Sequence, residues 1–247
     1  MNSMKPVKPV KPVKPVLTTD QIMEIMVEDK KLHDMPIAII TMGIPGSGKS
    51  TLVRRIIETK LGKIMGTGNN SSYKFSDFVN CNPDEILQYI DEPDAKARLA
   101  KASRKNAAIL KKIRESPDEK YSVIYDGTGV NKSAYKGNIN KFIQNGYFTL
   151  LVYVKTNPFI VRERMKKRTR KVDSNKVQSM FLKLNNNVNE NNDGNPMKLF
   201  DYYKKMVLEN KNGGAFIELD NTFKRVKITD SSVNSLDISS NLSNFNF

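Results

Sequence analysis

The most informative segment of this chain is residues 37–51, which read IAIITMGIPGSGKST. Its first six residues form a mainly apolar run, which predicts a strand buried on both faces. The next eight, Gly43 to Ser50, follow the pattern Gly-x-x-x-x-Gly-Lys-Ser, and an amphipathic helical pattern starts directly afterwards. A glycine-rich loop between a buried strand and a helix is the context that identifies a phosphate-binding loop.

This loop predicts how a nucleotide is held. Glycines let successive backbone N–H groups point inward at a phosphate, and the positive end of the following helix adds to the attraction. Lys49 is expected to reach the β- and γ-phosphate oxygens, and the Ser50 hydroxyl suits Mg²⁺. A dinucleotide-binding Gly-x-Gly-x-x-Gly loop is excluded because Thr51 stands at the third glycine position. We therefore expect ATP or GTP with Mg²⁺ as cofactors, bound by Gly43, Gly46, Ser47, Gly48, Lys49, Ser50 and Thr51.

Short apolar runs alternate with longer amphipathic stretches from Met35 onwards. This alternation predicts an α/β fold, a P-loop three-layer sandwich with a five-stranded parallel sheet, helices on both faces and an arginine-rich lid. The expected strands are Ile37–Met42, Ser76–Asn80, Ser122–Tyr125, Phe148–Val154 and Phe216–Leu219. The expected helices are Lys49–Thr59, Pro83–Ile90, Pro93–Glu115, Lys132–Asn145, Pro158–Arg168, Ser174–Asn185 and Pro196–Asn210.

The two ends of the chain depart from this pattern. Residues 1–17 form a leader in which Lys-Pro-Val occurs four times, and proline at every third position favours an extended, disordered spacer. It is either a solvated leader or an electrostatic arm for a polyanion or a membrane surface. Residues 18–34 are a helical extension, with a helix from about Thr19 to Leu32 that opens on a capping box. Residues 35–228 form the main domain, and 229–247 are a flexible tail rich in Ser and Asn.

Composition removes several classes of function. The chain has one cysteine, Cys81, and one histidine, His33, so neither an internal disulfide nor a Cys/His metal cluster can form. Cys81 is interpreted as a small buried residue. No apolar run reaches the about 18 residues of a membrane span, and no secretory signal is found, so we expect a cytoplasmic protein. The net charge of +15 calls for an anionic partner and leaves nucleic acid binding through a basic surface open.

Two expected strand ends carry candidates for the acceptor and metal side. Asp126 follows the strand that ends at Tyr125, where a P-loop fold orients Mg²⁺ or a metal-bound water, and Thr128 is an expected acceptor contact. The alternative for Asp126 is an acidic turn residue. Asn82 and Asp84 emerge beside the same edge, and Asp84 is the expected base; the alternative is that one of them caps the next helix.

A dense run of cations follows the fourth expected strand. Residues 162–171 contain seven basic residues and one acidic residue. A segment that closes cations onto the nucleotide would stabilise the charge spread over the transferring phosphoryl group. Arg164, Arg168 and Arg170 are the candidates for this lid. The alternative is a solvated helix face.

In combination these segments resemble the zeta-toxin family of P-loop kinases, which is close in architecture to polynucleotide kinases and adenylate-kinase-like enzymes. Four matches carry the resemblance: the loop at 43–51, Asn-Pro-Asp at 82–84, Asp-Gly-Thr at 126–128, and the arginine-rich segment after the fourth strand. Their order and spacing cover roughly residues 36–222.

The resemblance implies roles for individual residues. Asp84 would be the base that deprotonates the acceptor hydroxyl, and Thr128 would contact the acceptor. Arg164 together with Arg168 or Arg170 would be the lid arginines. The family acts on UDP-activated amino sugars and commonly has an arginine shortly after the catalytic aspartate, whereas residues 85–88 contain none.

Three functions remain open at this point. The leading hypothesis is an ATP- and Mg²⁺-dependent kinase that phosphorylates a hydroxyl of a small, anionic acceptor such as a nucleotide sugar. The second is a polynucleotide 5′-hydroxyl kinase, which the basic charge favours. The third is a P-loop ATPase or nucleotide-dependent switch without kinase activity.

Overall fold

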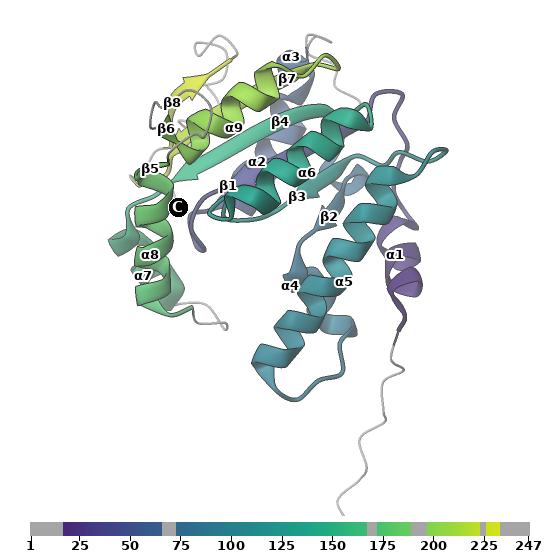
Figure 1. Ribbon diagram of the computed structural model, residues 1–247, viewed down its shortest axis with the longest axis horizontal. Coiled ribbons are helices and arrows are strands. Elements are labelled where there is room, and N and C mark those ends of the chain that lie inside the picture. Colours follow the sequence, from purple (N-terminus) through teal and green to yellow (C-terminus); the bar gives the residue numbers. More distant parts are fainter. Residues whose placement is uncertain (1–16, 66–72, 167–171, 189–196, 223–225, 233–247) are drawn as a thin grey trace, which may run out of the picture.

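The computed structural model describes residues 17–65, 73–166, 172–188, 197–222 and 226–232 (Figure 1). Most of the Lys-Pro-Val leader and most of the C-terminal tail lie outside these ranges. Within the described residues, no helix is long and apolar enough to cross a membrane.

A six-stranded sheet forms the centre of the molecule. Its order is β2 (Val79–Cys81), β3 (Val123–Tyr125), β1 (Ile37–Met42), β4 (Phe148–Lys155), β7 (Gly214–Asp220) and β8 (Lys227–Ser231). The first five run parallel, and β8 is antiparallel to β7. The predicted five parallel strands are thus confirmed, and the sixth strand was not predicted.

The central strand β1 is paired on both edges and covered on both faces. All six of its residues are buried, and successive side chains point to opposite sides. Ile37 and Ile39 belong to the cluster that includes α2 (Lys49–Thr59). Ala38, Ile40 and Met42 belong to the larger cluster on the other face. The continuous apolar run therefore reflects burial on both faces.

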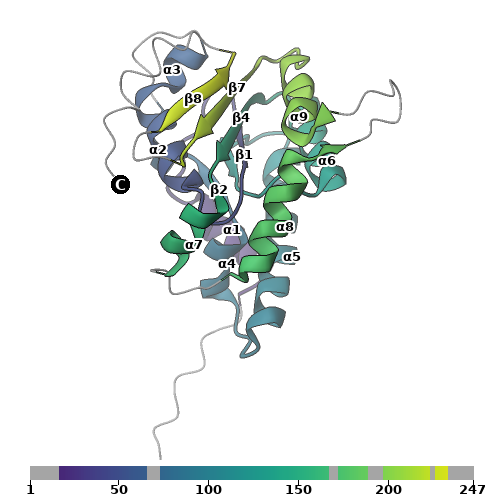
Figure 2. The ribbon, with the colours of Figure 1, turned by 90° about the vertical axis from the view of Figure 1, so that its left-hand side faces the viewer.

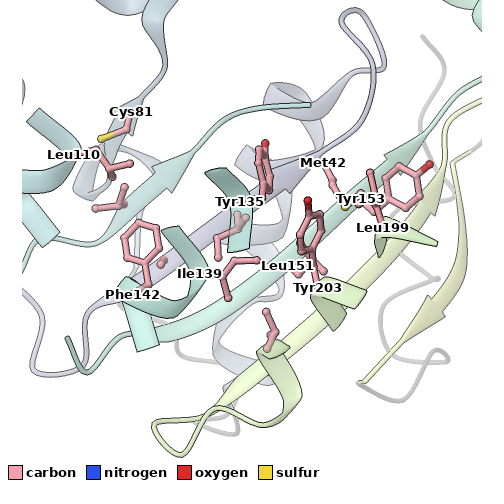
Figure 3. Packing of buried hydrophobic residues seen from close by; sticks show 14 of the residues in the cluster. Met42, Cys81, Leu110, Tyr135, Ile139, Phe142, Leu151, Tyr153, Leu199 and Tyr203 are labelled. Carbon is pink, nitrogen blue, oxygen red and sulfur yellow. The ribbon is translucent and has the colours of Figure 1, made fainter. Parts of the chain in front are cut away.

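Helices cover the sheet in two outer layers (Figure 2). One side carries α2 and α3 (Leu61–Ile64). The other side carries α5 (Ala95–Glu115), α6 (Lys132–Gln144) and α9 (Leu199–Leu208), whose buried side chains are shown in Figure 3. This arrangement confirms the three-layer sandwich.

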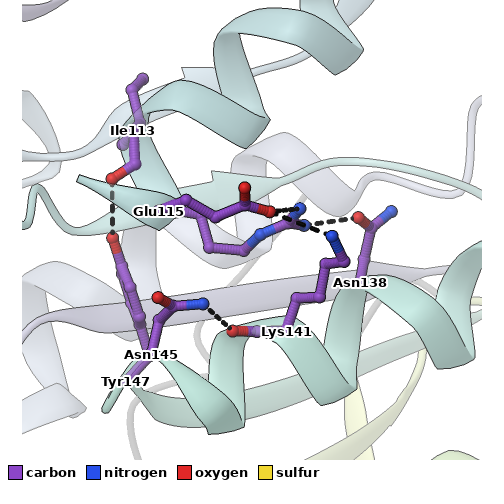
Figure 4. Close-up of polar contacts among 7 residues, drawn as sticks. Ile113, Glu115, Asn138, Lys141, Asn145 and Tyr147 are labelled. Carbon is purple, nitrogen blue, oxygen red and sulfur yellow. Dashed lines mark hydrogen bonds and ion pairs between the residues drawn. The ribbon is translucent and has the colours of Figure 1, made fainter. Parts of the chain in front are cut away.

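Polar contacts connect α5 to α6 (Figure 4). They lie toward the edge of the sheet opposite the strand ends that carry the candidate residues. The Glu115 carboxylate accepts hydrogen bonds from Lys141 at 3.1 Å and from Arg114 at 3.0 Å. Arg114 also donates to Asn138 of α6 at 2.7 Å. Since Arg114 is buried, these partners compensate its charge.

The N-terminal helix is shorter than predicted. It is α1 (Thr19–Val27), and it opens on the expected capping box between Thr18 and Gln21. It ends where the polar run at 28–31 offers no further apolar face to bury. Ile22 is fully buried in the larger cluster, so α1 packs on the main domain.

The strand predicted at 76–80 begins later than expected. Phe75–Asp77 is a 3₁₀ helix, η1, and β2 starts at Val79. The Asp77 carboxylate accepts a hydrogen bond from the Lys74 backbone N–H at 2.8 Å. This local bond stabilises a turn in competition with a strand.

One predicted helix is interrupted, another starts later, and the domain extends further than expected. The segment at 83–90 forms α4 (Pro83–Ile86) and the 3₁₀ helix η2 (Leu87–Tyr89). The helix predicted from 196 starts at 199, because β6 (Met197–Lys198) pairs first with β5 (Asn187–Val188). Residues 229–231, expected in the tail, belong to β8. There Thr229 donates to the Glu218 carboxylate at 2.8 Å.

Candidate active site

The loop between β1 and α2 has the backbone that phosphate binding requires. Gly43 and Gly48 have φ values of 138° and 94°, which side chains other than glycine rarely adopt. A Cβ on Gly43 would lie 2.5 Å from the Val154 carbonyl oxygen. The Gly43 N–H donates to the Thr128 carbonyl at 3.1 Å, which joins the loop to the segment after β3.

The Lys49 side chain contacts the backbone of the loop. Its Nζ donates to the carbonyl oxygens of Gly43 at 3.0 Å and Ile44 at 3.4 Å. The ammonium group is thus already held close to the loop whose first helical N–H groups have no intrahelical partner. Cation and amides together form a site for a polyphosphate.

One cavity of about 750 Å³ brings most of the predicted site residues together. The strand order explains this, because the carboxyl ends of β1, β2 and β3 lie at one edge of the sheet. Of the predicted residues, those that line the cavity are Gly46, Gly48, Lys49, Ser50, Thr51, Asn82, Asp84, Asp126 and Thr128. Gly43 and Ser47 are loop residues that are buried and do not line the cavity.

The Asp126 carboxylate is held on both oxygens. Oδ1 accepts a hydrogen bond from Thr41 Oγ1 at 2.6 Å, and Oδ2 accepts one from Asn82 Nδ2 at 2.8 Å. Thr41 Oγ1 in turn accepts from the Gly127 N–H at 3.2 Å. Tyr135 donates to the Thr41 carbonyl at 2.9 Å, and burial raises the pKa of its phenol well above the usual value. Two hydrogen bonds therefore fix the orientation of the Asp126 carboxylate at the cavity.

Ser50 and Asp126 also share a small cavity of about 10 Å³, room for about one water-sized sphere. Hydroxyl and carboxylate oxygens are suitable ligands for Mg²⁺, which takes few protein ligands and keeps several waters or phosphate oxygens. In the part of the chain that the structure describes, no three His, Cys, Asp or Glu side chains gather into an all-protein metal site. The donor set thus fits a metal that takes most of its ligands from a nucleotide and water.

Asn82 caps α4 and leaves Asp84 in the cavity. The Asn82 side-chain oxygen accepts from the Asp84 backbone N–H at 2.9 Å, while its nitrogen binds Asp126. The capping alternative raised from the sequence is therefore correct for Asn82. The Asp84 side chain is exposed and lines the cavity. The neighbouring Glu85 also lines it, and its carboxylate accepts from Asn80 at 3.2 Å.

Arg164 contacts the loop and does not line the cavity. In α7 (Pro158–Lys166), its guanidinium donates to the Asn221 carbonyl at 3.0 Å and to the Ser47 carbonyl at 3.5 Å. Burial lowers its pKa. Arg168 and Arg170, the other expected lid residues, lie outside the described residues.

Sequence reasoning missed several residues of the site. Thr41 was counted only as part of an apolar strand. Lys176 and Met180, one turn apart in α8 (Ser174–Asn185), line the cavity, and no local pattern says which face of that helix meets it. Among the described residues Lys176 makes no ion pair.

The fold and the loop define a P-loop nucleotide-binding protein. Residues 39–188, more than half of the chain, match the AAA domain family. The chain belongs to this family.

Two zeta toxins are similar to this chain in sequence, which confirms the resemblance inferred from the motifs. The chain is 28% identical over 107 residues to toxin zeta of Enterococcus hirae and 27% identical over 107 residues to toxin zeta of Streptococcus pyogenes. Each match covers 43% of this chain and 35% of the relative. The matched part is thus about a third of the relatives' length.

Solved structures support the same fold. A structure from the PezAT chromosomal toxin-antitoxin system of Streptococcus pneumoniae has a TM-score of 0.54 at 15% identity, over 91% of this chain and 84% of that one. The AvrRxo1-ORF1:ORF2 complex, in its native form, has a TM-score of 0.63 at 10% identity, over 91% and 71%. Its complex with ATP gives 0.61 at 11% identity, with the same coverage. At these identities the likeness concerns the fold alone.

Proposed function

We propose that the protein is an ATP- and Mg²⁺-dependent phosphotransferase that moves the γ-phosphoryl group to a hydroxyl of a small-molecule acceptor such as a nucleotide sugar. One observation carries this proposal: a single cavity of about 750 Å³ joins the phosphate loop to the carboxylates of Asp84 and Asp126. A phosphate donor and a hydroxyl acceptor can therefore meet in one space. Proximity of this kind is a large part of catalysis of phosphoryl transfer.

Each residue has a defined task in this proposal. The loop amides and Lys49 bind the β- and γ-phosphates. Asp84 takes the proton of the acceptor hydroxyl while that oxygen bonds to the γ-phosphorus and ADP leaves. Ser50 and Asp126 would hold the Mg²⁺, which when bound neutralises charge on the phosphates. Arg168 and Arg170 remain proposed lid cations, and Arg164 would join them only by releasing the Ser47 and Asn221 carbonyls that it binds in this structure.

The far wall of the cavity supports an acceptor with anionic and apolar parts. Lys176 and Met180 from α8 line it together with Leu99 from α5. A lysine ammonium suits a phosphate or carboxylate, while Leu99 and Met180 suit a ring or hydrocarbon surface. A nucleotide sugar has both features, and the similarity to zeta toxins favours it.

A second candidate is a polynucleotide 5′-hydroxyl kinase, and the net charge of +15 favours it. Lysines and arginines that neutralise backbone phosphates make binding strongly dependent on salt. This candidate uses the same loop and the same base, so the acceptor alone distinguishes it from the first.

Radiolabelled ATP offered with nucleotide sugars, nucleosides and 5′-hydroxyl oligonucleotides tests the proposal. Label should enter a nucleotide sugar, with Mg²⁺ required. Asp84→Asn should lower turnover by about 10² to 10⁴-fold while ATP still binds, and Lys49→Ala should lose ATP binding. Glu85→Gln is the matched control, because it neutralises the neighbouring carboxylate in the same cavity.

The other outcomes are separable. Salt-sensitive labelling of oligonucleotides alone would favour the second candidate. Slow ATP hydrolysis that labels no acceptor and tolerates Asp84→Asn would favour a nucleotide-dependent switch and contradict both kinase proposals.

A further inference from the structure

Three side chains converge on one carbonyl oxygen of the phosphate loop. The Ser47 carbonyl accepts hydrogen bonds from Asn221 Nδ2 at 2.7 Å, Thr156 Oγ1 at 3.2 Å and Arg164 Nη1 at 3.5 Å. The Asn221 contact is the shortest. Asn221 follows β7 and its relative exposure is 0%, so its amide is withdrawn from water to make this bond.

The direction of this carbonyl fixes the direction of the next amide. In a trans peptide the C=O of one residue and the N–H of the next point to opposite sides, and the structure has no cis peptide among the residues it describes. Ser47 is fully buried and does not line the cavity, whereas Gly48 does. The bond from Asn221 to the Ser47 oxygen therefore directs the Gly48 N–H away from Asn221.

The backbone around Asn221 shows that its side chain is not needed to place the residue itself. The Asn221 N–H donates to the Lys155 carbonyl at 2.8 Å, continuing the pairing of β7 with β4. That bond does not involve the side chain, so replacing Asn221 by Asp or Ala leaves its donor in place. The side-chain amide is left for the loop: a Cβ on Gly48 would lie 2.5 Å from Asn221 Nδ2.

We propose that Asn221 is a positioning residue for nucleotide binding, which orients the Ser47–Gly48 peptide so that the Gly48 N–H donates to the β-phosphate. The inference rests on the proposed function, since it needs a nucleotide on the loop. Asn221 also accepts from Arg164, through its carbonyl at 3.0 Å and through Oδ1 at 3.5 Å. The same residue therefore connects α7 to the loop peptide.

Asn221→Asp separates these two contacts. It has nearly the same shape, removes the donor to the Ser47 carbonyl and keeps an acceptor for Arg164. ADP affinity, measured by calorimetry with Mg²⁺, should fall about tenfold, as expected for one hydrogen bond to a charged group. AMP lacks the β-phosphate, so its affinity should change little and the ADP-to-AMP affinity ratio should fall by the same factor.

Asn210→Asp is the matched control. Asn210 is also buried, and its amide donates to the carbonyls of Tyr147 at 2.9 Å and Gly213 at 2.8 Å, away from the loop. This variant should lower the melting temperature without changing the ADP-to-AMP ratio. Asn221→Ala serves as the second test if the aspartate variant does not fold, and it should also lower that ratio.

The inference is overturned if both Asn221 variants bind ADP as the wild type does, or if Asn210→Asp lowers the ratio equally. A wild-type protein that binds neither ADP nor ATP would instead remove the proposed function together with this inference. Wild-type binding with an unchanged ratio in the variants overturns the inference alone.

Discussion

Replacing Thr41 by Val tests whether the orientation of Asp126 matters for turnover. Valine has nearly the same shape, so the packing of β1 is kept. The change removes the 2.6 Å donor to the Asp126 carboxylate and the acceptor of the Gly127 N–H. Asp126 then keeps the bond from Asn82 on its other oxygen.

The expected size of the effect follows from these contacts. Thr41 is 1% exposed, and a hydrogen bond to a charged group contributes about 1.5 to 3 kcal/mol. The free energy of unfolding should fall by about 2 kcal/mol, and the melting temperature by about 4 to 8 °C for a chain of this size. Under the proposal that Asp126 holds Mg²⁺, removing a partner of that ligand should lower kcat by about 10- to 100-fold. Urea titration and the radiolabel assay measure the two effects.

Thr149→Val is the matched control. Thr149 is a fully buried threonine in β4, and its hydroxyl accepts from Asn210 at 3.1 Å. Its loss should cost about 1 kcal/mol and leave kcat unchanged. If Thr41→Val lowers kcat no more than this control does, the Thr41 contact has no part in the reaction.

Three further predictions concern Gly48, His33 and Cys81. Gly48→Ala places a Cβ 2.5 Å from Asn221 Nδ2 at a φ of 94°, so urea titration should show that the free energy of unfolding falls by about 1 to 2 kcal/mol. Gly137 lies in α6 with open space around it. Gly137→Ala should therefore raise the free energy of unfolding by about 0.5 to 1 kcal/mol. Burial lowers the pKa of His33 below 6.5, so the unfolded state binds the proton first and stability should fall as the pH drops through 6.5. This is the single histidine, and unfolding curves of His33→Asn should lose that dependence. Burial raises the pKa of Cys81 to about 12, so alkylation at pH 8 should occur only as fast as unfolding; rapid labelling of the folded protein would contradict this.

The phosphate loop could be predicted from the sequence because its information is local. Ile37–Met42 and Lys49–Thr59 have the predicted bounds in the structure, since the apolar run, the glycines and the helix start follow one another directly. Ligands bind at the carboxyl ends of the strands in open α/β sheets, and this rule predicted that Asp84 and Asp126 lie beside the loop. Both residues do line its cavity. Their chemical roles remain predictions.

Contacts between distant segments could not be predicted in this way. Asn221 is 174 residues from Ser47, and only the strand order, with β7 beside β4 and β4 beside β1, brings them together. The hydroxyl of Thr41 gave no signal in an apolar strand. The strand β8 was missed because residues 227–231 are mostly polar, and only pairing with the edge of β7 makes them a strand.

The strand order also separates two networks around the loop. On the β3 side, Thr41 contacts Asp126; on the β4 and β7 side, Asn221 contacts Ser47 and Arg164. No hydrogen-bonded residue is shared by these two sets of contacts.

The free-energy effects of mutations in residues without shared partners usually add within about 0.5 kcal/mol. The double variant Thr41→Val with Asn221→Asp should therefore show the kcat loss of one single variant and the ADP affinity loss of the other. A deviation well beyond about 0.5 kcal/mol in either quantity would mean that the loop transmits strain between the two sides and that the nucleotide and metal sides act as one unit.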